Sequence, residues 1–292
     1  MNKVYGIVIL YNTDLKQASA NINCYLPYID RLMVWANSTI ENKAEFLQML
    51  SDESKIDLVQ SEENAGISKP LNEAVSRATE GGYTYLLTMD QDSTWQNLPE
   101  YLDKAIALRS EDNTVKITGP SIVECEDGQM PDDQKIASGV SYDTYIITSG
   151  ALYDVKLFEE VGPFPEVYFI DAVDEEICLR ATAHGYKYAM VRDGIMLHNF
   201  GKRTEHRFLW KKVVTHDYSA VRYYYTVRNH TWLIRSKFVR SGDKMKLLKT
   251  HVITSFARII LFEKDKKTKF ASAFRGLREG MSNKQRDEWE KC

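Results

Sequence analysis

The sequence has 292 residues, of which 43% are hydrophobic and 27% charged, with 15 Gly, 7 Pro and 4 Cys. This composition is typical of globular domains and excludes collagen-like, Pro/Gly-rich disordered and disulfide-scaffold proteins. The formal net charge of -3 hides an uneven distribution. Residues 201–292 hold 23 Lys and Arg against 9 Asp and Glu, whereas residues 1–200 hold 15 against 32. A chain that is acidic in one part and basic in another indicates two different roles.

The first 120 residues alternate between strand and helix patterns. Apolar runs predict strands at 4–10, 32–36, 56–59 and 83–89. Between them, apolar residues at helical spacing predict helices at 15–26, 41–50 and 67–79. Strands that alternate with helices imply a parallel sheet, which binds ligands at the carboxyl ends of its strands. The expected fold class is therefore α/β, with a central sheet flanked by helices.

The pattern changes after residue 90. Short β-like pieces at 115–123, 136–140 and 145–148 are broken by Gly, Pro and Asp, and helices are predicted at 155–161 and 174–184. Beyond about residue 205 the chain is expected to be helical, basic and aromatic. We therefore predict a nucleotide-binding catalytic domain at 1–205 and a basic, aromatic helical region at 206–292.

The cysteines and the N-terminus bear on the compartment. The four cysteines are far apart and form no C-x-x-C pair, which argues against a structural zinc site and a disulfide framework. The N-terminus enters directly into an apolar strand, without the features of a signal peptide. The best apolar candidate, 252–262, is interrupted by Arg258 and is too short to span a bilayer of about 30 Å. We expect a cytoplasmic protein.

Two carboxylates, Asp90 and Asp92, leave the end of the strand predicted at 83–89. Hard divalent cations take oxygen ligands, and Mg2+ or Mn2+ often bridges a carboxylate to the phosphates of a nucleotide. A solvated turn is the other interpretation, because Asp and Ser favour turns. The position after a buried strand favours the metal. His198 follows another apolar piece and could complete such a site or be a structural histidine.

Asn64 and Gly66 lie where the third strand ends and the next helix begins. Gly66 allows a ligand to approach the backbone closely, and a helix N-terminus favours phosphate groups. An ordinary helix start would explain the same residues.

Four acidic residues occur within six positions: Asp171, Asp174, Glu175 and Glu176. They repel one another at neutral pH unless a cation or a positive partner offsets their charge. Asp174 stands where a helix is expected to begin, so helix capping is one explanation. The other is that one carboxylate is a general base that takes a proton from an alcohol nucleophile.

The ordered set of segments resembles the family 2 glycosyltransferases of the GT-A fold, and most closely their rhamnosyltransferase-like branch. The matching pieces are VILYN, VWANST, NAGISKPLNEA, DQDS, TSGALYDVKLFEEVGPFPE, FIDAVDEEICLRATAHGYKYAMV and MLHNFG. They cover roughly residues 3–201 in the expected order. Arg222-Tyr223-Tyr224-Tyr225 and Arg228-Asn229 also resemble the segment that follows the catalytic domain in that branch. The resemblance implies a Rossmann-like GT-A domain with a mixed central sheet and a helical C-terminal extension.

The same resemblance implies a nucleotide-binding pocket. Its members would be Tyr11, Asn12, Asn37, Asn64, Gly66, Asn72 and, on the ribose, Asp90. Asn37 departs from the acidic residue that most members carry there, which leaves recognition of the base open. Asp92 and His198 would hold Mg2+ or Mn2+ on the diphosphate of the donor.

Further implied roles concern the sugar and the base. Ser149 and Gly150 would lie beside the donor or acceptor sugar, and Glu175 is grouped with these substrate-binding residues. Asp174 matches the catalytic base, although it follows Val173 where many members carry an acidic residue, and Asp171 could share that role. The implied reaction is a single displacement with inversion, in which the base deprotonates the acceptor hydroxyl and the metal offsets the charge of the leaving diphosphate.

The basic C-terminal part contains an amphipathic stretch at 245–262. Its apolar residues at helical spacing are Leu248, Val252, Phe256, Ile259 and Ile260, accompanied by Lys246, Lys249 and Arg258. One interpretation is a helix at a membrane interface that is attracted to anionic lipid. Another is a helix packed on the catalytic domain. No recognised nucleic-acid module accompanies the charge, so we expect no nucleic-acid partner.

The expected function is an inverting, metal-dependent glycosyltransferase of bacterial surface-polysaccharide synthesis. The donor would be a nucleotide sugar such as dTDP-L-rhamnose, and the acceptor a saccharide or lipid-linked saccharide, used in the cytoplasm or at the inner face of its membrane. A UDP-hexose transferase of the same fold is the nearest alternative. A nucleotidyltransferase would carry a Gly-rich basic loop where Tyr11-Asn12-Thr13-Asp14 stands, and a non-catalytic sugar-binding descendant would have lost Asp92 or Asp174.

Overall fold

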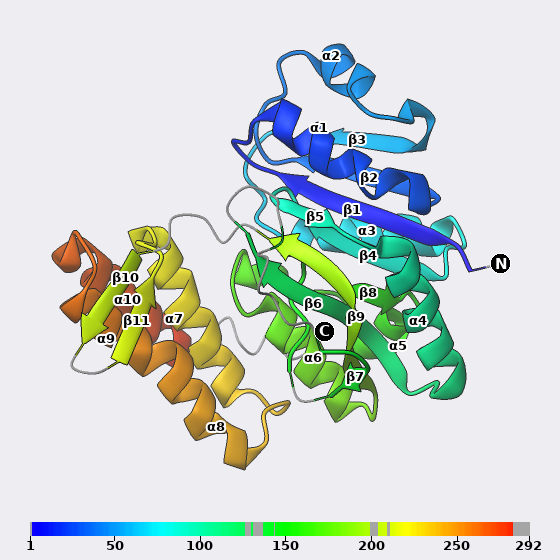
Figure 1. Cartoon of the computed structure of the whole chain (residues 1–292). Coiled ribbons are helices and arrows are strands. Elements are labelled where there is room, and N and C mark those ends of the chain that lie inside the picture. The colour runs from blue at the N-terminus through cyan, green and yellow to red at the C-terminus, as the bar shows by residue number, and fades with distance from the viewer. Residues whose placement is uncertain are drawn as a thin grey trace. The chain divides into compact units, whose positions relative to one another are not determined.

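The computed structural model describes residues 2–125, 130, 137–142, 144–198, 204–208 and 211–282. The chain divides into two compact units, coloured along its length in Figure 1. Unit 1 comprises residues 1–164 and 180–199, and unit 2 comprises residues 165–179 and 200–292. Residues 165–179 precede the boundary predicted near 205, yet they group with unit 2.

Unit 1 is built on one mixed sheet. Its strands are β1 (Val4–Leu10), β2 (Arg31–Ala36), β3 (Ile56–Gln60), β4 (Tyr85–Asp90), β5 (Ser93–Trp95), β6 (Val115–Glu124), β7 (Val140–Ser141), β8 (Leu152–Asp154) and β9 (Lys187–His198). The strand order is β3-β2-β1-β4-β8-β6-β9-β5, and β7 pairs with β9. Strands β3, β2, β1 and β4 are parallel, whereas β8 runs antiparallel to β4 and β6. The α/β class and the mixed sheet are confirmed.

Helices cover both faces of this sheet (Figure 1). They are α1 (Leu15–Asn23), α2 (Lys43–Gln48), α3 (Ser68–Glu80), α4 (Leu98–Glu111) and α5 (Leu157–Val161), with 3-10 turns at Leu26–Tyr28 and Glu53–Lys55. Alternate residues of β1, including Val8 and Leu10, share one apolar cluster with residues of α1 and α4. Helix α3 packs on β1 and β4, and its buried residues lie outside that cluster. Burial on both faces explains why β1 is a continuous apolar run.

Three predictions of secondary structure were wrong or incomplete. The β-like piece expected at 145–148 is not a strand, and the strand that pairs in its place is β8. Ile136, the first residue of the piece expected at 136–140, lies outside the described residues, and of the other four only Val140 belongs to a strand. Helix α4 was not predicted, although Pro99 in its first turn is a typical start signal. The strand predictions failed in this part of the chain because strands of two or three residues, such as β7 and β8, are too short to show an alternating hydrophobic pattern.

Unit 2 is mainly helical. It contains a 3-10 turn (Glu166–Tyr168), β10 (Thr204–Phe208), β11 (Lys211–Thr215), α7 (Ala220–Arg235), α8 (Ser241–Leu247), a π-helical turn (Leu248–Ile253), α9 (Thr254–Leu261) and α10 (Lys266–Met281). Helix α6 (Val173–Ala183) begins in unit 2 and ends in unit 1. The helical region predicted beyond residue 205 is confirmed from α7 onward, but β10 and β11, which form an antiparallel hairpin, precede it.

Close helix packing holds unit 2 together. Helix α10 approaches the backbone of α7 at Gly276 and Gly280, where an added Cβ would lie 2.4 Å from the carbonyl oxygen of Tyr224 and 2.6 Å from the Cβ of Thr231. Larger side chains at these two positions would therefore separate the helices. None of the helices within the described ranges combines the length and apolarity needed to cross a bilayer.

Candidate active site

The parallel strands of unit 1 bring polar residues to one edge of the sheet. Ile9 of β1 is in register with Asp90 of β4, and Leu10 is in register with Ala36 of β2. The segments that follow these three strands therefore leave the sheet side by side. This is the edge at which α/β sheets bind ligands.

Asp90, Asp92 and His198 offer three ligand atoms that all lie within 4.8 Å of one another. Strand β5 produces this cluster, because Ser93 pairs with His198 across the antiparallel ladder to β9. Nδ1 of His198 lies 3.6 Å from Oδ1 of Asp92, a spacing compatible with two ligands of one divalent ion. The predicted metal residues thus lie together, and Asp90, which was expected on the ribose, is part of the same cluster.

Hydrogen bonds hold the imidazole of His198 in place. Oγ of Ser93 lies 2.6 Å from Nδ1 of His198 and 2.8 Å from Oγ of Ser149. Burial lowers the pKa of His198 against the opposing effect of the Asp92 carboxylate. The imidazole is therefore neutral at pH 7, which is the form that binds metals. Two carboxylates and a neutral imidazole are a donor set that fits Mg2+ or Mn2+.

Residues 149 and 150 border this cluster. The backbone N–H of Asp90 donates to Oγ of Ser149 at 3.2 Å, so Ser149 connects the loop after β4 to the His198 network. Gly150 has a φ of 77°, and its Cβ would lie 2.8 Å from Sδ of Met196. Glycine is required there because of both the left-handed backbone and the lack of space.

The loop after β1 is tied to the loop after β4. The N–H of Tyr11 donates to Oε1 of Gln91, and the N–H of Asn12 donates to Oγ of Ser38. The Tyr11 side chain is 47% exposed, which leaves its ring free to stack on a planar ligand. The backbone contacts place Tyr11 and Asn12 at the same sheet edge as Asp90.

Asn37 is buried and joins β2 to the loop at residues 64–66. Its Oδ1 accepts hydrogen bonds from Nε1 of Trp35 and the N–H of Ala65, and its Nδ2 donates to the carbonyl of Gly66. Within that loop the N–H of Gly66 donates to Oδ1 of Asn64. Asn37 therefore positions the loop.

Asn72 of α3 makes a different connection. Its Nδ2 donates to the carbonyl of Phe164 and its Oδ1 accepts from the N–H of the same residue, 92 positions away. This pairing ties α3 to the segment after α5. These contacts account for the carboxamide of Asn72 through backbone pairing, a role that its position in the sequence did not suggest.

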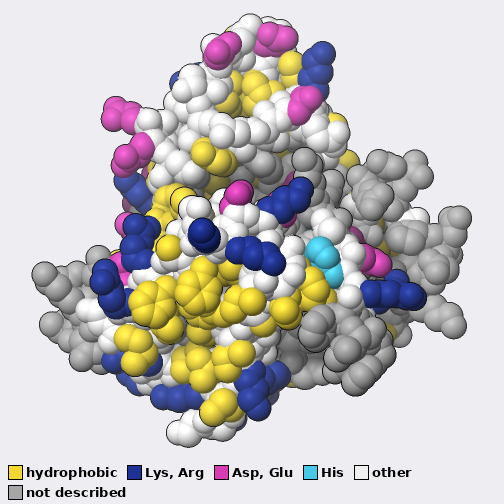
Figure 2. All heavy atoms as spheres, turned by 90° about the vertical axis from the view of Figure 1, so that its left-hand side faces the viewer, with side chains coloured by type: hydrophobic (Ala, Val, Ile, Leu, Met, Phe, Trp, Pro, Cys, Tyr) yellow, Lys and Arg dark blue, Asp and Glu magenta, His cyan; other side chains and the backbone are white. Residues whose placement is uncertain are grey.

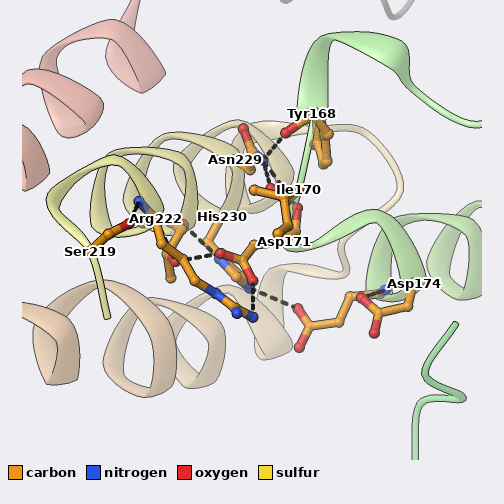
Figure 3. A network of polar contacts seen from close by, with 10 residues as sticks. Tyr168, Ile170, Asp171, Asp174, Ser219, Arg222, Asn229 and His230 are labelled. Carbon is orange, nitrogen blue, oxygen red and sulfur yellow. Dashed lines mark hydrogen bonds and ion pairs between the residues drawn. The ribbon is translucent and has the colours of Figure 1, made fainter. Parts of the chain in front are cut away.

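In unit 2, the acidic segment before α6 has an unusual backbone. Phe169, Asp171 and Ala172 have φ values of 57°, 67° and 63°, in the left-handed region that non-glycine residues rarely adopt. Helix α7 holds this segment: Nδ2 of Asn229 lies 2.7 Å from the carbonyl oxygens of Tyr168 and Ile170 and 3.0 Å from that of Asp171. Figure 3 shows Asn229 and Asp171 facing each other in this arrangement.

The two candidate bases have different surroundings. Oδ1 of Asp171 accepts from the Arg222 guanidinium at 3.2 Å (Figure 3). Its Oδ2 accepts from the Thr226 hydroxyl at 2.7 Å. Burial raises the pKa of Asp174 to about 6, with the Glu175 and Asp171 charges acting in the same direction. A carboxylate that is ionised at pH 7 and has a raised pKa suits a general base. Asp171 is engaged with a cation, so the geometry favours Asp174.

Comparison with known proteins bears on the fold and the type of enzyme. The chain is 28% identical, over 82% of its own length and of the relative's, to the dTDP-rhamnosyl transferase RfbF of Shigella flexneri. Residues 1–349 of S. aureus TarS superpose on 98% of this chain and 83% of theirs, with a TM-score of 0.62 and 15% identity. The chain is a glycosyltransferase with the GT-A fold. No protein-family model matches it.

A second solved structure bears on the metal. The mannosyltransferase PcManGT of Pyrobaculum calidifontis, in complex with GDP-Man and Mn2+, matches 99% of the glycosyltransferase and 88% of its own chain, with a TM-score of 0.60 and 16% identity. At this identity the likeness concerns the fold alone. The same fold nevertheless accommodates a nucleotide sugar and a divalent ion in that enzyme.

Several residues of the glycosyltransferase were not found by sequence reasoning. Arg222 and Asn229 belong to the cluster that resembles the family, but no role was assigned to them, because their contacts are with a segment more than 50 positions earlier. His230 and His251 were overlooked altogether. Oε1 and Oε2 of Glu175, expected to bind substrate, lie 3.1 Å from Nε2 of His251 and 3.3 Å from Nε2 of His230. No periodicity or motif links these three positions.

Proposed function

We propose that this glycosyltransferase transfers a sugar from a nucleoside-diphosphate donor to an acceptor hydroxyl in one displacement, with inversion at the anomeric carbon. Unit 1 would bind the donor, and Asp174 would be the base. The observation that carries the proposal is the cluster of Asp90, Asp92 and His198 at the carboxyl edge of the sheet. Their donor atoms suit an ion held on a diphosphate.

The residues of unit 1 would orient the donor. Asp90, Asp92 and His198 would hold the ion, which when bound offsets the negative charge that develops on the leaving diphosphate. The exposed ring of Tyr11 is suited to stacking on the base of the nucleotide. The Ser93–Ser149 pair would keep His198 in one orientation while the ion binds.

Asp174 would take the proton from the acceptor hydroxyl as the oxygen attacks. Its pKa of about 6 keeps it ionised at neutral pH, while it remains basic enough to accept the proton. Arg222 and Thr226 hold Asp171 through both carboxylate oxygens, which makes that residue a support of the loop. Because attack and departure occur on opposite faces of the sugar, this single step inverts the configuration.

For the donor we propose dTDP-L-rhamnose, which is supported by the relative named as a dTDP-rhamnosyl transferase. The acceptor would be a saccharide or lipid-linked saccharide. A test is a thermal-shift panel of dTDP-, UDP- and GDP-sugars with Mn2+, because a ligand that binds the folded state raises the melting temperature. The dTDP-sugar is expected to give the largest shift. A larger shift with a UDP-sugar would transfer the proposal to a UDP-hexose donor.

The metal role is tested by Asp92→Asn. This variant should lower Mn2+-dependent turnover by about 100-fold or more, because a charged ligand is replaced by a neutral one. Asp103→Asn is a matched control, since Asp103 is an exposed carboxylate on α4. Undiminished turnover by Asp92→Asn at low Mn2+ concentration would refute the metal role.

A surface of unit 2 supports a further part of the proposal, peripheral binding to anionic membranes. Figure 2 shows a band of hydrophobic side chains bordered by Lys and Arg. The large apolar residues exposed in α8 to α10 are Met245, Ile253, Ile260, Leu261, Phe270, Phe274 and Met281. Exposed apolar side chains beside basic ones are suited to the boundary between acyl chains and anionic headgroups.

This surface differs from the one that the sequence suggested. The helical spacing at 245–262 is borne out, but Val252 and Ile259 are buried in a cluster with Tyr223, Val227 and Ala273 of the same unit. Most of the apolar stripe thus packs inward within unit 2, and of its members only Ile260 is strongly exposed, at 54%. The exposed residues on the other side of these helices are the ones proposed to meet lipid.

Co-sedimentation with vesicles tests this surface. Wild-type protein should bind vesicles that contain anionic phosphatidylglycerol more tightly than vesicles of phosphatidylcholine, and added salt should weaken the binding. Phe274→Ser should reduce binding several-fold, because a 57% exposed aromatic side chain is lost. Tyr28→Ser removes an aromatic side chain of unit 1 with 51% exposure and serves as the control. Equal binding by both variants would exclude the proposed surface.

A further inference from the structure

The side chain of Glu175 ends between two histidines from different helices. Nε2 of His230, on α7, lies 3.3 Å from Oε2, and Nε2 of His251, on the π-helical turn, lies 3.1 Å from Oε1. The two imidazole rings are stacked, with centroids 3.9 Å apart and planes inclined by 7°. His230 is buried, and Glu175 and His251 are partly buried. One carboxylate thus meets two parallel imidazoles away from bulk water.

One hydrogen bond and one ion pair of His230 indicate where its protons lie. Nδ1 lies 2.7 Å from the carbonyl oxygen of Thr226, which can only accept, so Nδ1 carries a proton. Nε2 faces a carboxylate oxygen, which also accepts when it is ionised. A proton on both nitrogens makes His230 an imidazolium. Burial disfavours that charge, but Glu175, the Thr226 carbonyl and Asp171 outweigh it, and the pKa of His230 is raised.

These three residues are also close enough to be considered as a metal site. The stacking argues against that interpretation. Because the ring planes are inclined by only 7°, the in-plane lone pairs of the two Nε2 atoms lie in two nearly parallel, separated planes and do not meet at one ion. A proton shared with a carboxylate needs no such convergence. The arrangement therefore suits a positive charge on one ring, with the second ring stacked on it.

The position of Glu175 links this pair to the reaction. Glu175 follows Asp174 directly in α6, and consecutive helical residues point in different directions. Its carboxylate is therefore directed to the histidines, while its negative charge still raises the pKa of Asp174. The charged groups that influence Asp174 and His230 are Glu175 on α6 and Asp171 on the preceding loop. His251 on the π-helical turn contacts Glu175, and Arg222 of α7 pairs with Asp171.

We propose that His230 is a positioning residue for the transfer reaction: as an imidazolium stacked on His251, it binds Glu175 and offsets its charge beside Asp174. Without this positive charge, the uncompensated Glu175 carboxylate would hold the proton on Asp174 to a higher pH. The pair thereby sets the pH at which the base becomes available. This inference rests on the proposed role of Asp174 as the base.

The first experiment does not depend on activity. 15N-edited NMR of the imidazoles, with His230→Gln for assignment, follows protonation of both nitrogens against pH. We expect His230 to titrate above the ordinary value of about 6.5, and Glu175→Gln to lower its midpoint by on the order of one pH unit. Exposed His184, which makes the same contact from Nδ1 to the carbonyl four residues earlier, serves as the reference imidazole in these spectra. A wild-type midpoint for His230 at or below 6.5 would overturn the proposal.

The second experiment uses the pH profile of kcat/KM. Glu175→Gln should move the acidic limb to lower pH, and His230→Gln should move it to higher pH, each by on the order of half to one unit. The double variant should return close to wild type, because both charges are absent. A purely structural role would reduce kcat without these opposite shifts, and that result would overturn the proposal.

Two further variants protect the interpretation. His251→Gln keeps a neutral N–H donor for Oε1 of Glu175. The acidic limb of its kcat/KM profile is therefore expected within about 0.3 pH unit of wild type. A shift as large as that of His230→Gln would assign the positive charge to His251. Asp174→Asn separates the proposal that Asp174 is the base from the proposal that His230 is charged. If this variant still transfers sugar, the assignment of Asp174 as the base fails. A raised titration midpoint of His230 in the same variant would still support the charged pair of His230 and Glu175. Stoichiometric Zn2+ binding that His251→Gln abolishes would make this a metal centre instead.

Discussion

Replacing Asn229 with alanine would release the segment that leads into α6. The Asn229 side chain is fully buried, and its amide donates to the carbonyl oxygens of Tyr168, Ile170 and Asp171. Its Oδ1 also accepts from Nε of Arg228 at 3.0 Å. Alanine can make none of these contacts, so several buried polar groups would lose their partner together.

The expected loss of stability follows from two terms. Each buried polar group left without its hydrogen bond costs about 1–3 kcal/mol, reduced by whatever water can enter. The three left-handed residues, Phe169, Asp171 and Ala172, cost on the order of 1 kcal/mol each, and the Asn229 hydrogen bonds offset this strain. Since the released segment relaxes partly, we expect Asn229→Ala to lower the free energy of unfolding by about 2–4 kcal/mol.

The assay is urea unfolding at pH 7, followed by circular dichroism and by the turnover that remains before unfolding. Ala172→Gly provides an internal check, because glycine removes the strain at a φ of 63° and should recover about 1 kcal/mol in the Asn229→Ala background. Asn229→Asp should be at least as damaging as alanine, since it places a carboxylate against three carbonyl oxygens. Unchanged stability of Asn229→Ala, to within about 0.5 kcal/mol, would refute the argument.

Three other predictions concern the active site. Asp174→Asn should reduce the rate of sugar transfer by about 1,000-fold or more, while the donor should still raise the melting temperature of this variant. Asp171→Asn should retain much more transfer activity. The reverse order of the two variants would identify Asp171 as the base. Because the pKa of Asp174 is raised from 3.8 to about 6, the folded state binds this proton more tightly than the unfolded state, and stability from this group falls as the pH rises from 4 to 6. Asp174→Asn should therefore raise the melting temperature above pH 6 and have little effect below pH 4, and an equal effect at both pH values would contradict the raised pKa. Gly150→Ala should lower the free energy of unfolding in urea by about 1–3 kcal/mol, because the added Cβ would lie 2.8 Å from Sδ of Met196. The affinity for Mn2+ should also fall, because Ser149 would be displaced. Unaltered stability would mean that the loop around Gly150 accommodates the Cβ without strain.

The local patterns of unit 1 were sufficient to predict its sheet edge. The apolar run of β1 extends over the predicted residues, 4–10, because a strand buried on both faces leaves a continuous apolar signal. Asp90 and Asp92 could be assigned to the ligand-binding edge because they directly follow such a strand. The resemblance then added His198, which pairs with Ser93 across β5 and β9. Polar clusters that come from strand ends can be predicted from the sequence in this way.

The surroundings of the acidic segment could not be read from the chain. Asp171, Asp174 and Glu175 look alike as a cluster of carboxylates, and local spacing offers no way to distinguish them. Only tertiary contacts separate them: Arg222 and Thr226 hold Asp171, two histidines hold Glu175, and burial leaves Asp174 with a raised pKa. Each difference depends on partners some 50 to 80 positions away, for which sequence periodicity carries no signal.

The amphipathic stretch at 245–262 shows the same division. Its helical spacing and its basic residues follow from the order of side chains alone, because a 3.6-residue period is a local property. Which side faces solvent depends on what packs against it, and in unit 2 the cluster around Tyr223 and Val227 takes up Val252 and Ile259. The sequence by itself therefore determined the α/β class, the sheet edge that carries Asp90 and Asp92, and the charge of the two parts of the chain. Tertiary packing alone decided the raised pKa of Asp174, the charged neighbours of this residue and the exposed apolar surface, because burial and long-range pairing set those properties.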